Sequence, residues 1–356
     1  MSGCYLMITV RALVYFTKNI NSRGDLEEEF SFARGVLSTL EEGLKSLGFS
    51  VFSKRISFPG LSRDLALRLV DYTGRGIYVS IGYSRDFTVD DIVELTSSGV
   101  YVPLLSPVNP SREVAEKYVE AVTKTSQRDP LAATRVSIGF HGEDFLTPYY
   151  PDSSSPGFRL IGVSILYPRA LLSAYKSTGS LSEAFKQVFS RAEVVARVVR
   201  ETSGLPVRVD YSLSPWMSES VAELYEEAGC SLLEPGGLYY TWLLNKYISE
   251  YSNPDLKTGF NEVMLPYIED NKLKEYGERG LLSARRLLYY ASTCVAGLDM
   301  AVLPENKDKL LKLVLDAMSL SVVKQKPTSL RVIPVPGKPG DRVKLGVFGE
   351  VTVLDY

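Results

Sequence analysis

Residues 292–304 read STCVAGLDMAVLP, and the fold prediction starts from this stretch. It holds Cys294, Gly297 and Asp299 within six residues and then continues as a short apolar strand over residues 300–303, which is followed by Pro304. A strongly amphipathic helix is expected just before it, over residues 281–290. A helix is also expected after it, over residues 305–320, and a strand over residues 330–335. Strands that alternate with helices in this way indicate crossover connections on a largely parallel sheet.

The same alternation extends through the rest of the chain. Periodicity and turn residues predict strands at 8–16, 49–56, 76–81, 100–105, 134–140, 160–166 and 207–213, with helices between most of them. The clearest helix opens with the capping box Ser180-Leu-Ser-Glu183 and stops at Gly204. No linker or low-complexity tract divides the sequence. We therefore expect one α/β domain over residues 1–356, barrel-like or doubly wound, with halves of roughly 1–150 and 151–356.

Composition and charge limit the kinds of partner. The chain has 356 residues, with 40 basic and 42 acidic side chains and a net charge of −2. This balance argues against nucleic-acid and membrane-surface partners, which require a basic face, and leaves a small-molecule ligand as the expected partner. No apolar run approaches the roughly 20 residues of a membrane span. The oligomeric state stays open, with a homodimer as one alternative.

The cysteine pattern indicates the compartment. Cys4, Cys230 and Cys294 are far apart, so they form neither a disulfide framework nor a zinc-ligand spacing, and a reducing cytosol is the simplest interpretation. Residues 4–10 lack the features of a signal peptide. Few glutamines and a single histidine, His141, are typical of heat-adapted proteins.

Several catalytic motifs are absent from the sequence. It contains no Gly-rich dinucleotide fingerprint, no P-loop and no G-x-S-x-G nucleophile elbow. One histidine cannot form a His-rich metal site. The cofactor and the metal are therefore left unknown.

Polar residues near strand ends are the candidate catalytic groups. His141 follows a predicted strand and begins the long loop HGEDFLTPYYPDSSSPG (141–157), so it is a candidate general acid or base; a solvated polar loop is the alternative. Cys294 and Asp299 are candidates for a reactive thiol and a cavity-facing carboxylate, against a packed thiol and a turn-capping Asp. Asp210 and Glu262 lie on otherwise apolar strands, where structural ion pairing is the alternative.

Further polar residues are candidates for substrate binding. Ser212 and Asn261 lie beside the strand carboxylates, and the basic pairs Lys54–Arg55 and Lys324–Lys326 stand at strand ends. Lys326 or Arg331 would hold an anionic group, although solvated lysines are the default. Tyr149–Tyr150, and Tyr239–Tyr240 with Trp242, are expected to line an apolar pocket or to pack in the core.

Several segments carry a family resemblance. Cys294-Val-Ala-Gly-Leu-Asp-Met300, the segment from Lys326 to Lys338, Asp210-Tyr-Ser-Leu-Ser-Pro215 and Lys54-Arg-Ile-Ser57 resemble the uncharacterised family called domain of unknown function 711. The resemblance spans most of the chain. This chain is shorter than bacterial members and has Leu166-Tyr167-Pro168 where they have Ser-Gly-Pro, which makes Tyr167 a candidate substrate-binding residue.

The resemblance implies a fold similar to that of pyruvate formate-lyase and other glycyl-radical enzymes, a ten-stranded α/β barrel made of two parallel halves. The glycyl-radical motif is missing, because Arg331-Val-Ile is followed by Pro334. The main hypothesis is an enzyme that acts on a small anionic metabolite in the barrel cavity. A non-catalytic metabolite-binding or assembly protein is the alternative, and a radical enzyme is the third.

Overall fold

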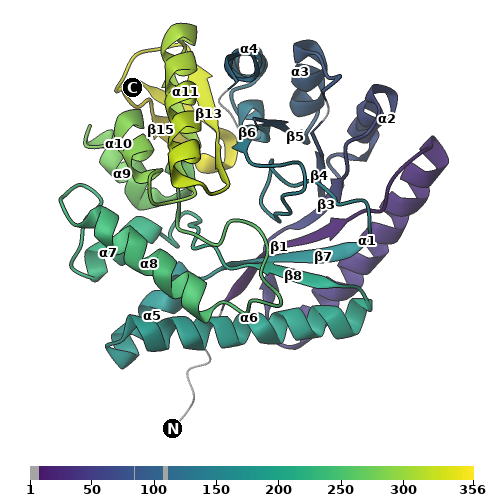
Figure 1. The fold of residues 1–356 in the computed structure, drawn as a ribbon, viewed down its shortest axis with the longest axis horizontal. Helices are drawn as coiled ribbons and strands as arrows, with labels where there is room; N and C mark the ends of the chain where they lie inside the picture. Colours follow the sequence, from purple (N-terminus) through teal and green to yellow (C-terminus); the bar gives the residue numbers. More distant parts are fainter. Residues whose placement is uncertain (1–7, 84, 107–110) are drawn as a thin grey trace.

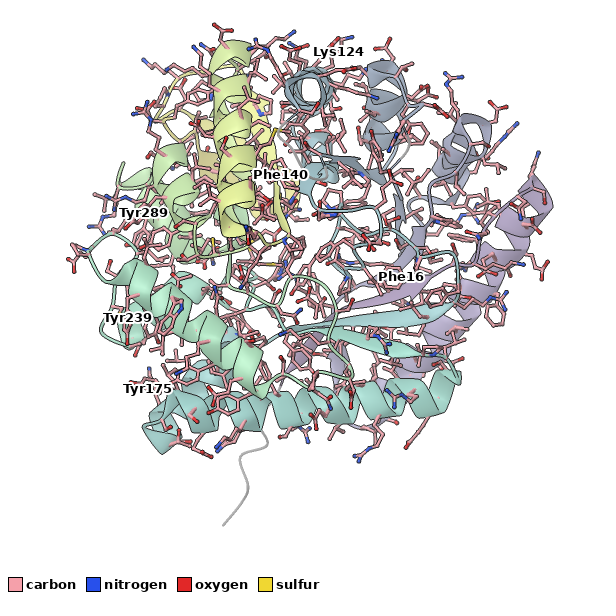
Figure 2. All side chains as sticks on the ribbon, in the orientation of Figure 1. Phe16, Lys124, Phe140, Tyr175, Tyr239 and Tyr289 are labelled. Atoms are coloured by element: carbon pink, nitrogen blue, oxygen red, sulfur yellow. The ribbon has the colours of Figure 1, made fainter. Side chains whose placement is uncertain are left out.

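The computed structural model describes residues 8–83, 85–106 and 111–356. Cys4 lies outside these ranges, as does Pro110, the first residue of a helix that the sequence predicts over residues 110–125. The protein is mixed α/β, with helices around the outside and strands toward the middle (Figure 1). Figure 2 shows Tyr175, Tyr239 and Tyr289 near the outer edge, whereas Phe16 and Phe140 lie closer to the centre. The predicted alternation of strands and helices is therefore confirmed.

A curled sheet forms the middle of the molecule. Its strands run in the order β12-β6-β5-β4-β3-β1-β7-β8, and β2 pairs with the start of β1. Neighbours are parallel except at β1–β7 and β6–β12, where the pairing is antiparallel. The strands are β1 (Thr9–Phe16), β2 (Ser50–Val51), β3 (Lys54–Phe58), β4 (Tyr78–Ile81), β5 (Val100–Leu105), β6 (Val136–Phe140), β7 (Leu160–Leu166), β8 (Val207–Asp210) and β12 (Thr328–Leu330).

The second half of the chain also contains short strand pairs outside the main sheet. β9 (Met264–Pro266) pairs in parallel with β10 (Ala296–Asp299), and β11 (Ala301–Pro304) with β13 (Val332–Val335). A bridge from Leu213 to Val263 joins the segment after β8 to the segment before β9. β12 and β13 follow each other directly, so one segment contacts β6 and then β11. A hairpin of β14 (Arg342–Lys344) and β15 (Glu350–Thr352) lies near the C-terminus.

The helices cover the outer face of the strands. In α6, the hydroxyl of the N-cap Ser180 accepts a hydrogen bond from the Glu183 N–H, and Gly204 ends the helix with φ +66°. The other helices also bury an apolar face, either against strands or against a neighbouring helix, as α8 does on α6. They are α1 (Arg23–Ser46), α2 (Arg63–Arg68), α3 (Val89–Ser97), α4 (Arg112–Arg128), α5 (Pro168–Thr178), α6 (Leu181–Ser203), α7 (Val221–Glu227), α8 (Gly237–Tyr251), α9 (Asn271–Glu278), α10 (Ala284–Tyr290) and α11 (Lys307–Lys324).

The stretch 292–304 joins α10 to two strands. Met300 has φ +53° and separates β10 from β11, so the expected single strand over 300–303 is one part of a bent pair. The predicted strand over residues 49–56 is likewise divided into β2 and β3. Positive φ is costly for a residue with a side chain and persists only where the surrounding contacts impose it.

The long loop 141–157 runs into the curl of the sheet. Residues Thr147–Tyr150 are buried, the Tyr150 hydroxyl donates to the Ile56 carbonyl at 2.7 Å, and Asp152 accepts from Ser137 at 2.7 Å. Tyr150 also packs on the side of β1 that faces away from the main helix-covered core. Both faces of β1 are therefore covered, which explains its continuous apolar pattern. The alternative of a solvated loop holds only for Glu143 and Asp144 near its start and Pro156 near its end, which are exposed.

None of the helices in the described part of the chain is long and apolar enough to cross a membrane.

Candidate functional site

The side chains predicted to be catalytic are not gathered in one cavity. Asp210 and Glu262 belong to one buried polar cluster, His141 lines a cavity beyond the end of β6, and Asp299 belongs to an ion-pair network elsewhere. Cys294 lies in the hydrophobic core. Each group is described in turn.

Asp210 organises a turn. Its carboxylate is fully buried and accepts hydrogen bonds from the Ser212 N–H at 2.8 Å, the Ser212 hydroxyl at 2.6 Å, the Phe260 N–H at 2.8 Å and the Asn261 N–H at 3.2 Å. Asn261 has φ +54° and accepts from the Tyr211 N–H. Burial raises the pKa of Asp210, and the hydrogen bonds oppose this shift. These contacts join β8 to the segment before β9.

Glu262 is the centre of a buried ion-pair cluster. Its two carboxylate oxygens bond the ammonium groups of Lys324 at 2.5 Å and Lys326 at 2.7 Å. Lys324 also donates to the backbone carbonyl of Cys294 at 2.9 Å. Ser212 accepts from the Glu262 N–H, which links this cluster to the Asp210 turn. Structural pairing, the alternative considered for Glu262, is what the contacts show.

Cys294 and Tyr167 are packed among apolar side chains. Both are fully buried, and neither contributes to the cavities described below. A Cβ placed on Gly297 would lie 2.9 Å from the Cys294 Sγ, so the absence of a side chain at Gly297 lets Cys294 pack closely against it. The Tyr167 hydroxyl donates to the Tyr211 carbonyl at 2.7 Å, and its ring packs on Phe189.

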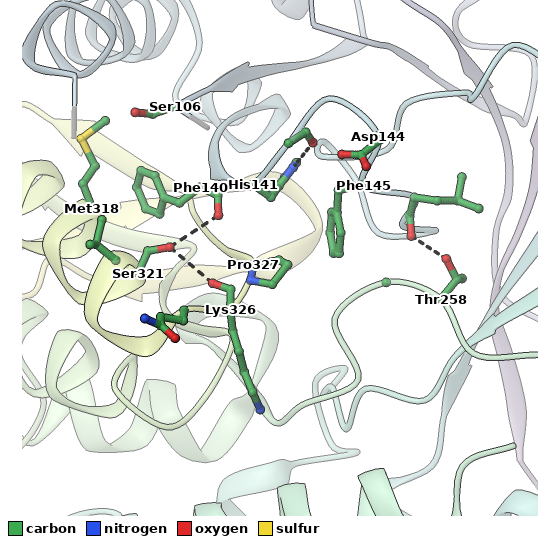
Figure 3. Close-up of a pocket in the computed structure, with 15 residues that line it drawn as sticks. Ser106, Phe140, His141, Asp144, Phe145, Thr258, Met318, Ser321, Lys326 and Pro327 are labelled. Atoms are coloured by element: carbon green, nitrogen blue, oxygen red, sulfur yellow. Dashed lines mark hydrogen bonds between the residues drawn. The ribbon is translucent and has the colours of Figure 1, made fainter. Parts of the chain in front are cut away.

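A cavity of about 700 Å³ opens beyond the carboxyl ends of β5 and β6 (Figure 3). Two predicted site residues, His141 and Lys326, line it, with Asp144, Phe145 and Thr258 on its other sides. The His141 ring stacks on Phe145, and its Nδ1 lies 3.0 Å from the Gly142 carbonyl. Its Nε2 is buried without a hydrogen-bond partner among the described residues. A Cβ on Gly139 would clash with this nitrogen, which therefore faces the strand.

We expect stability to depend on pH through His141. Burial lowers the pKa of this histidine below its usual value, against the opposing carboxylates of Asp152 and Asp144. A lowered folded-state pKa stabilises the fold above about pH 6.5, and this stabilisation is lost as the pH falls through the folded-state pKa. The free energy of unfolding should therefore fall by up to roughly 1.4 kcal/mol per pH unit below pH 6.5. In His141→Gln this fall should be smaller, because the histidine is gone.

The measurement is denaturant unfolding between about pH 7.5 and pH 5.5, the range in which histidine titrates. His141 is the one histidine of the chain, so an NMR titration reads its pKa directly. A folded-state pKa at or above the usual value would contradict the expectation.

Asp299 and Arg331 belong to a second buried network. The Arg331 guanidinium binds the Asp299 carboxylate through two hydrogen bonds, at 2.7 and 2.6 Å. Arg331 also lies 3.4 Å from Glu269, which pairs with Arg11 at 2.5 Å. Because Arg11 is on β1, Glu269 follows β9 and Arg331 lies between β12 and β13, the network connects the two halves of the chain. Asp299 is thus paired with an arginine instead of capping its own turn.

This network borders a second cavity, of about 220 Å³, which we call the arginine cavity. Tyr78 and Tyr101 line it from the first residues of β4 and β5, so it lies at the opposite end of these strands from the His141 cavity. Half of its lining residues are buried, and Phe52, Tyr78 and Val347, which are 43%, 49% and 74% exposed, form its rim. Its lining residues are Arg11, Phe52, Arg55, Tyr78, Tyr101, Leu131, Thr134, Arg135, Tyr149, Tyr150, Trp216, Glu269, Met300, Arg331, Val347 and Phe348.

Two guanidinium groups in the arginine cavity have no carboxylate partner among the residues that the structure describes. Arg55 is only 8% exposed, donates to the Ser53 hydroxyl at 3.0 Å and lies over the Tyr150 ring at 4.8 Å. Arg135 donates to the Thr96 carbonyl at 2.7 Å. No carboxylate of the described ranges lies within 4 Å of either group. Burial accordingly lowers the pKa of Arg55, and the cavity has excess positive charge.

The sequence indicated only part of this cavity. Arg331, Arg55 and the pair Tyr149–Tyr150 were candidates and do line it. Arg11 and Glu269 were not singled out. An arginine within the apolar run ITVRALVYF was an available signal, because a charge on a buried strand needs a partner or a ligand. The other aromatic candidates were Tyr239, Tyr240 and Trp242. Tyr239 and Trp242 are exposed, and their rings stack on each other on the surface of α8.

One family of known proteins matches a large part of the chain. Residues 108–346, more than half of it, match the family described as Uncharacterised ACR (DUF711). The chain belongs to the DUF711 family. This membership confirms the resemblance seen in the sequence and brings no activity with it, because the family is uncharacterised.

Relatives of this DUF711 protein carry the name UPF0210 protein. The one from Oleidesulfovibrio alaskensis is 26% identical over 267 residues, which is 68% of this chain and 58% of the relative. Those from Halothermothrix orenii and Methanocorpusculum labreanum are 31% and 34% identical, over 55% and 46% of this chain and 48% and 38% of the relatives. The chain thus spans about half the length of the curated relatives it matches.

Within the described ranges, no three His, Cys, Asp or Glu side chains gather as ligands of one metal ion would. The metal and the cofactor stay unassigned.

Proposed function

We propose that this DUF711 protein binds a small anionic metabolite in the arginine cavity. The observation that carries the proposal is Arg55, a buried guanidinium without a carboxylate partner among the described residues. A buried charge that is not paired costs free energy, so proteins keep one where a ligand supplies the counter-charge. Arg135 stands in the same wall, likewise unpaired, and guanidinium groups match the geometry of carboxylates and phosphates.

The fold we propose for this site is the ten-stranded α/β barrel made of two parallel halves. Its support is the pairing pattern, in which β6 to β1 form one parallel run and β7 continues toward β13 by parallel pairs and the Leu213–Val263 bridge. The antiparallel contacts β1–β7 and β6–β12 join the two runs. The arginine cavity would then lie at one mouth of the barrel. For the compartment, we keep the cytosol, which the cysteine pattern favours.

Ligand binding is better supported than acid–base catalysis. Glu269 is the carboxylate in the wall of the arginine cavity, and its two oxygens already contact Arg11 and Arg331. A general base needs a carboxylate that can accept the substrate's proton. The loop that enters the curl of the sheet, residues 141–157, contains no cysteine. It therefore gives no support to the third hypothesis, radical chemistry.

The proposal is tested by replacing Arg55 with methionine, which keeps the length and removes the charge. Titration calorimetry with benzoate, succinate, glycerol 3-phosphate and inorganic phosphate should show that wild type binds at least one of them. Loss of a charge-assisted contact of about 1.5–3 kcal/mol should weaken that binding roughly 10- to 100-fold. Without ligand, Arg55→Met should be at least as stable as wild type, because the unpaired buried charge is gone.

The matched control is Arg112→Met, at the start of α4, whose side chain is 71% exposed and pairs with Glu116. It should bind the same anion with unchanged affinity. The proposal fails if wild type binds none of the four anions, or if Arg55→Met binds as tightly as wild type.

A further inference from the structure

The aromatic side chains of the arginine cavity form two connected groups. Tyr101 contacts Tyr78 with ring centroids 5.8 Å apart and Tyr150 with centroids 5.1 Å apart. Trp216 contacts Phe52 at 4.8 Å and Phe348 at 5.8 Å. All of these rings line one cavity, and the two groups come from opposite halves of the sequence apart from Phe52. The wall therefore offers large apolar surfaces beside its positive charges.

The hydrogen-bonding groups of the cavity are mainly donors. Its four guanidinium groups can only donate. Both oxygens of Glu269 already contact arginines, and the hydroxyls of Thr134 and Tyr150 donate to backbone carbonyls, so they keep only their lone pairs as acceptors. A ligand with many hydroxyl groups, such as a sugar phosphate, would find few acceptors among these many donors, at about 1–3 kcal/mol for each hydroxyl left unpaired. A ligand whose polar atoms are all acceptors satisfies this wall.

The size of the cavity limits the ligand further. About 220 Å³ corresponds to roughly seven water molecules at about 30 Å³ each. This space suits one ring with one or two carboxylate groups and is too small for a nucleotide or a coenzyme. Ligands of drug size occupy cavities from about 300 Å³ upward.

We infer that the ligand is a single-ring aromatic carboxylate, with its carboxylate on Arg55 and Arg135 and its ring against the aromatic wall. This inference rests on the proposed function and specifies its ligand class. Aromatic rings in contact contribute about 0.5–1.5 kcal/mol beyond the area they bury, so a saturated ring of the same size should bind less tightly.

The experiment uses the fluorescence of Trp216 in the full chain. The protein has two tryptophans, and Trp242→Phe leaves Trp216, in the cavity wall, as the reporter. The probes are benzoate, cyclohexanecarboxylate and glycerol 3-phosphate. We expect benzoate to change the fluorescence and to bind about threefold or more tighter than cyclohexanecarboxylate and at least tenfold tighter than glycerol 3-phosphate. Trp216→Phe, which retains the exposed Trp242, should show no benzoate-dependent change.

The possible outcomes separate this inference from the proposed function. If glycerol 3-phosphate binds most tightly and Arg55→Met abolishes its binding, the aromatic class is overturned and anion binding stands. If cyclohexanecarboxylate binds as tightly as benzoate, the requirement for an aromatic ring is overturned. If Arg55→Met binds every probe as wild type does, both the inference and the proposed function are overturned.

Discussion

Replacing Glu269 with alanine is expected to lower the free energy of unfolding by about 3–5 kcal/mol. Glu269 is buried between Arg11 and Arg331, and it is the carboxylate with which Arg11 pairs in the described structure. Removal of the carboxylate leaves the Arg11 charge buried and uncompensated. Denaturant unfolding monitored by circular dichroism measures the loss.

Glu275 provides a matched control on the surface. It also pairs with two cations, Lys272 and Arg279, but its side chain is 45% exposed. Exposed pairs contribute about 0–1 kcal/mol, so Glu275→Ala should cost no more than that. Equal losses of unfolding free energy in the two variants would show that the buried network does not connect the two halves of the chain as described.

A double substitution separates the pair from its burial. Arg11→Met with Glu269→Met removes both charges and should be clearly more stable than Glu269→Ala alone, because apolar replacement of a complete buried pair is often neutral or stabilising. The coupling free energy follows from the two single variants and the double variant. A double variant as unstable as the sum of the single variants would contradict an interaction between these residues.

Asp210→Ala is the second substitution with a large expected effect, a loss of about 3 kcal/mol or more. The carboxylate accepts hydrogen bonds from the Ser212 N–H and hydroxyl and from the N–H groups of Phe260 and Asn261. Without it these buried donors lose their acceptor, at about 1–3 kcal/mol for each donor left unpaired. The turn with positive φ at Gly259 and Asn261 should then open, which amide hydrogen exchange would detect.

Asp255→Ala is the control for this experiment, because Asp255 is exposed in a nearby loop. Surface substitutions of this kind change stability by less than about 0.5 kcal/mol. If Asp210→Ala unfolds at the same denaturant concentration as Asp255→Ala, the turn does not depend on the carboxylate. A normal exchange rate for the Phe260 amide would lead to the same conclusion.

The helices and strands were largely predictable because their signals are local. The N-cap Ser180 and the stop at Gly204 bound α6 as expected, although of the predicted capping box only the bond from the Glu183 N–H to Ser180 is seen; the buried run 160–166 forms β7. The interruption at Met300 was not predictable, because its positive φ is imposed by neighbouring strands and not by its own preference. Chain order also does not reveal that β12 pairs with β6, since that contact joins residues far apart in sequence.

The candidate site shows the same division. Composition and spacing singled out polar residues that lie in buried positions, among them Asp210, Glu262 and Asp299. They could not show that Asp210 and Glu262 are satisfied by backbone donors and lysines, or that Arg55 is left without a carboxylate within the described ranges. Burial and partner are properties of residues brought together by the fold.

The sequence by itself determined the alternation of helices and strands, the small net charge and the family, because these follow from local periodicity, composition and short motifs. Only the tertiary structure decided which charges are neutralised. Loop 141–157 enters the curl of the sheet, Glu269 reaches across to Arg11, and Arg55 faces the arginine cavity. The physical reason is that the cost of a buried charge depends on what lies within a few ångströms of it, and those neighbours come from distant parts of the chain.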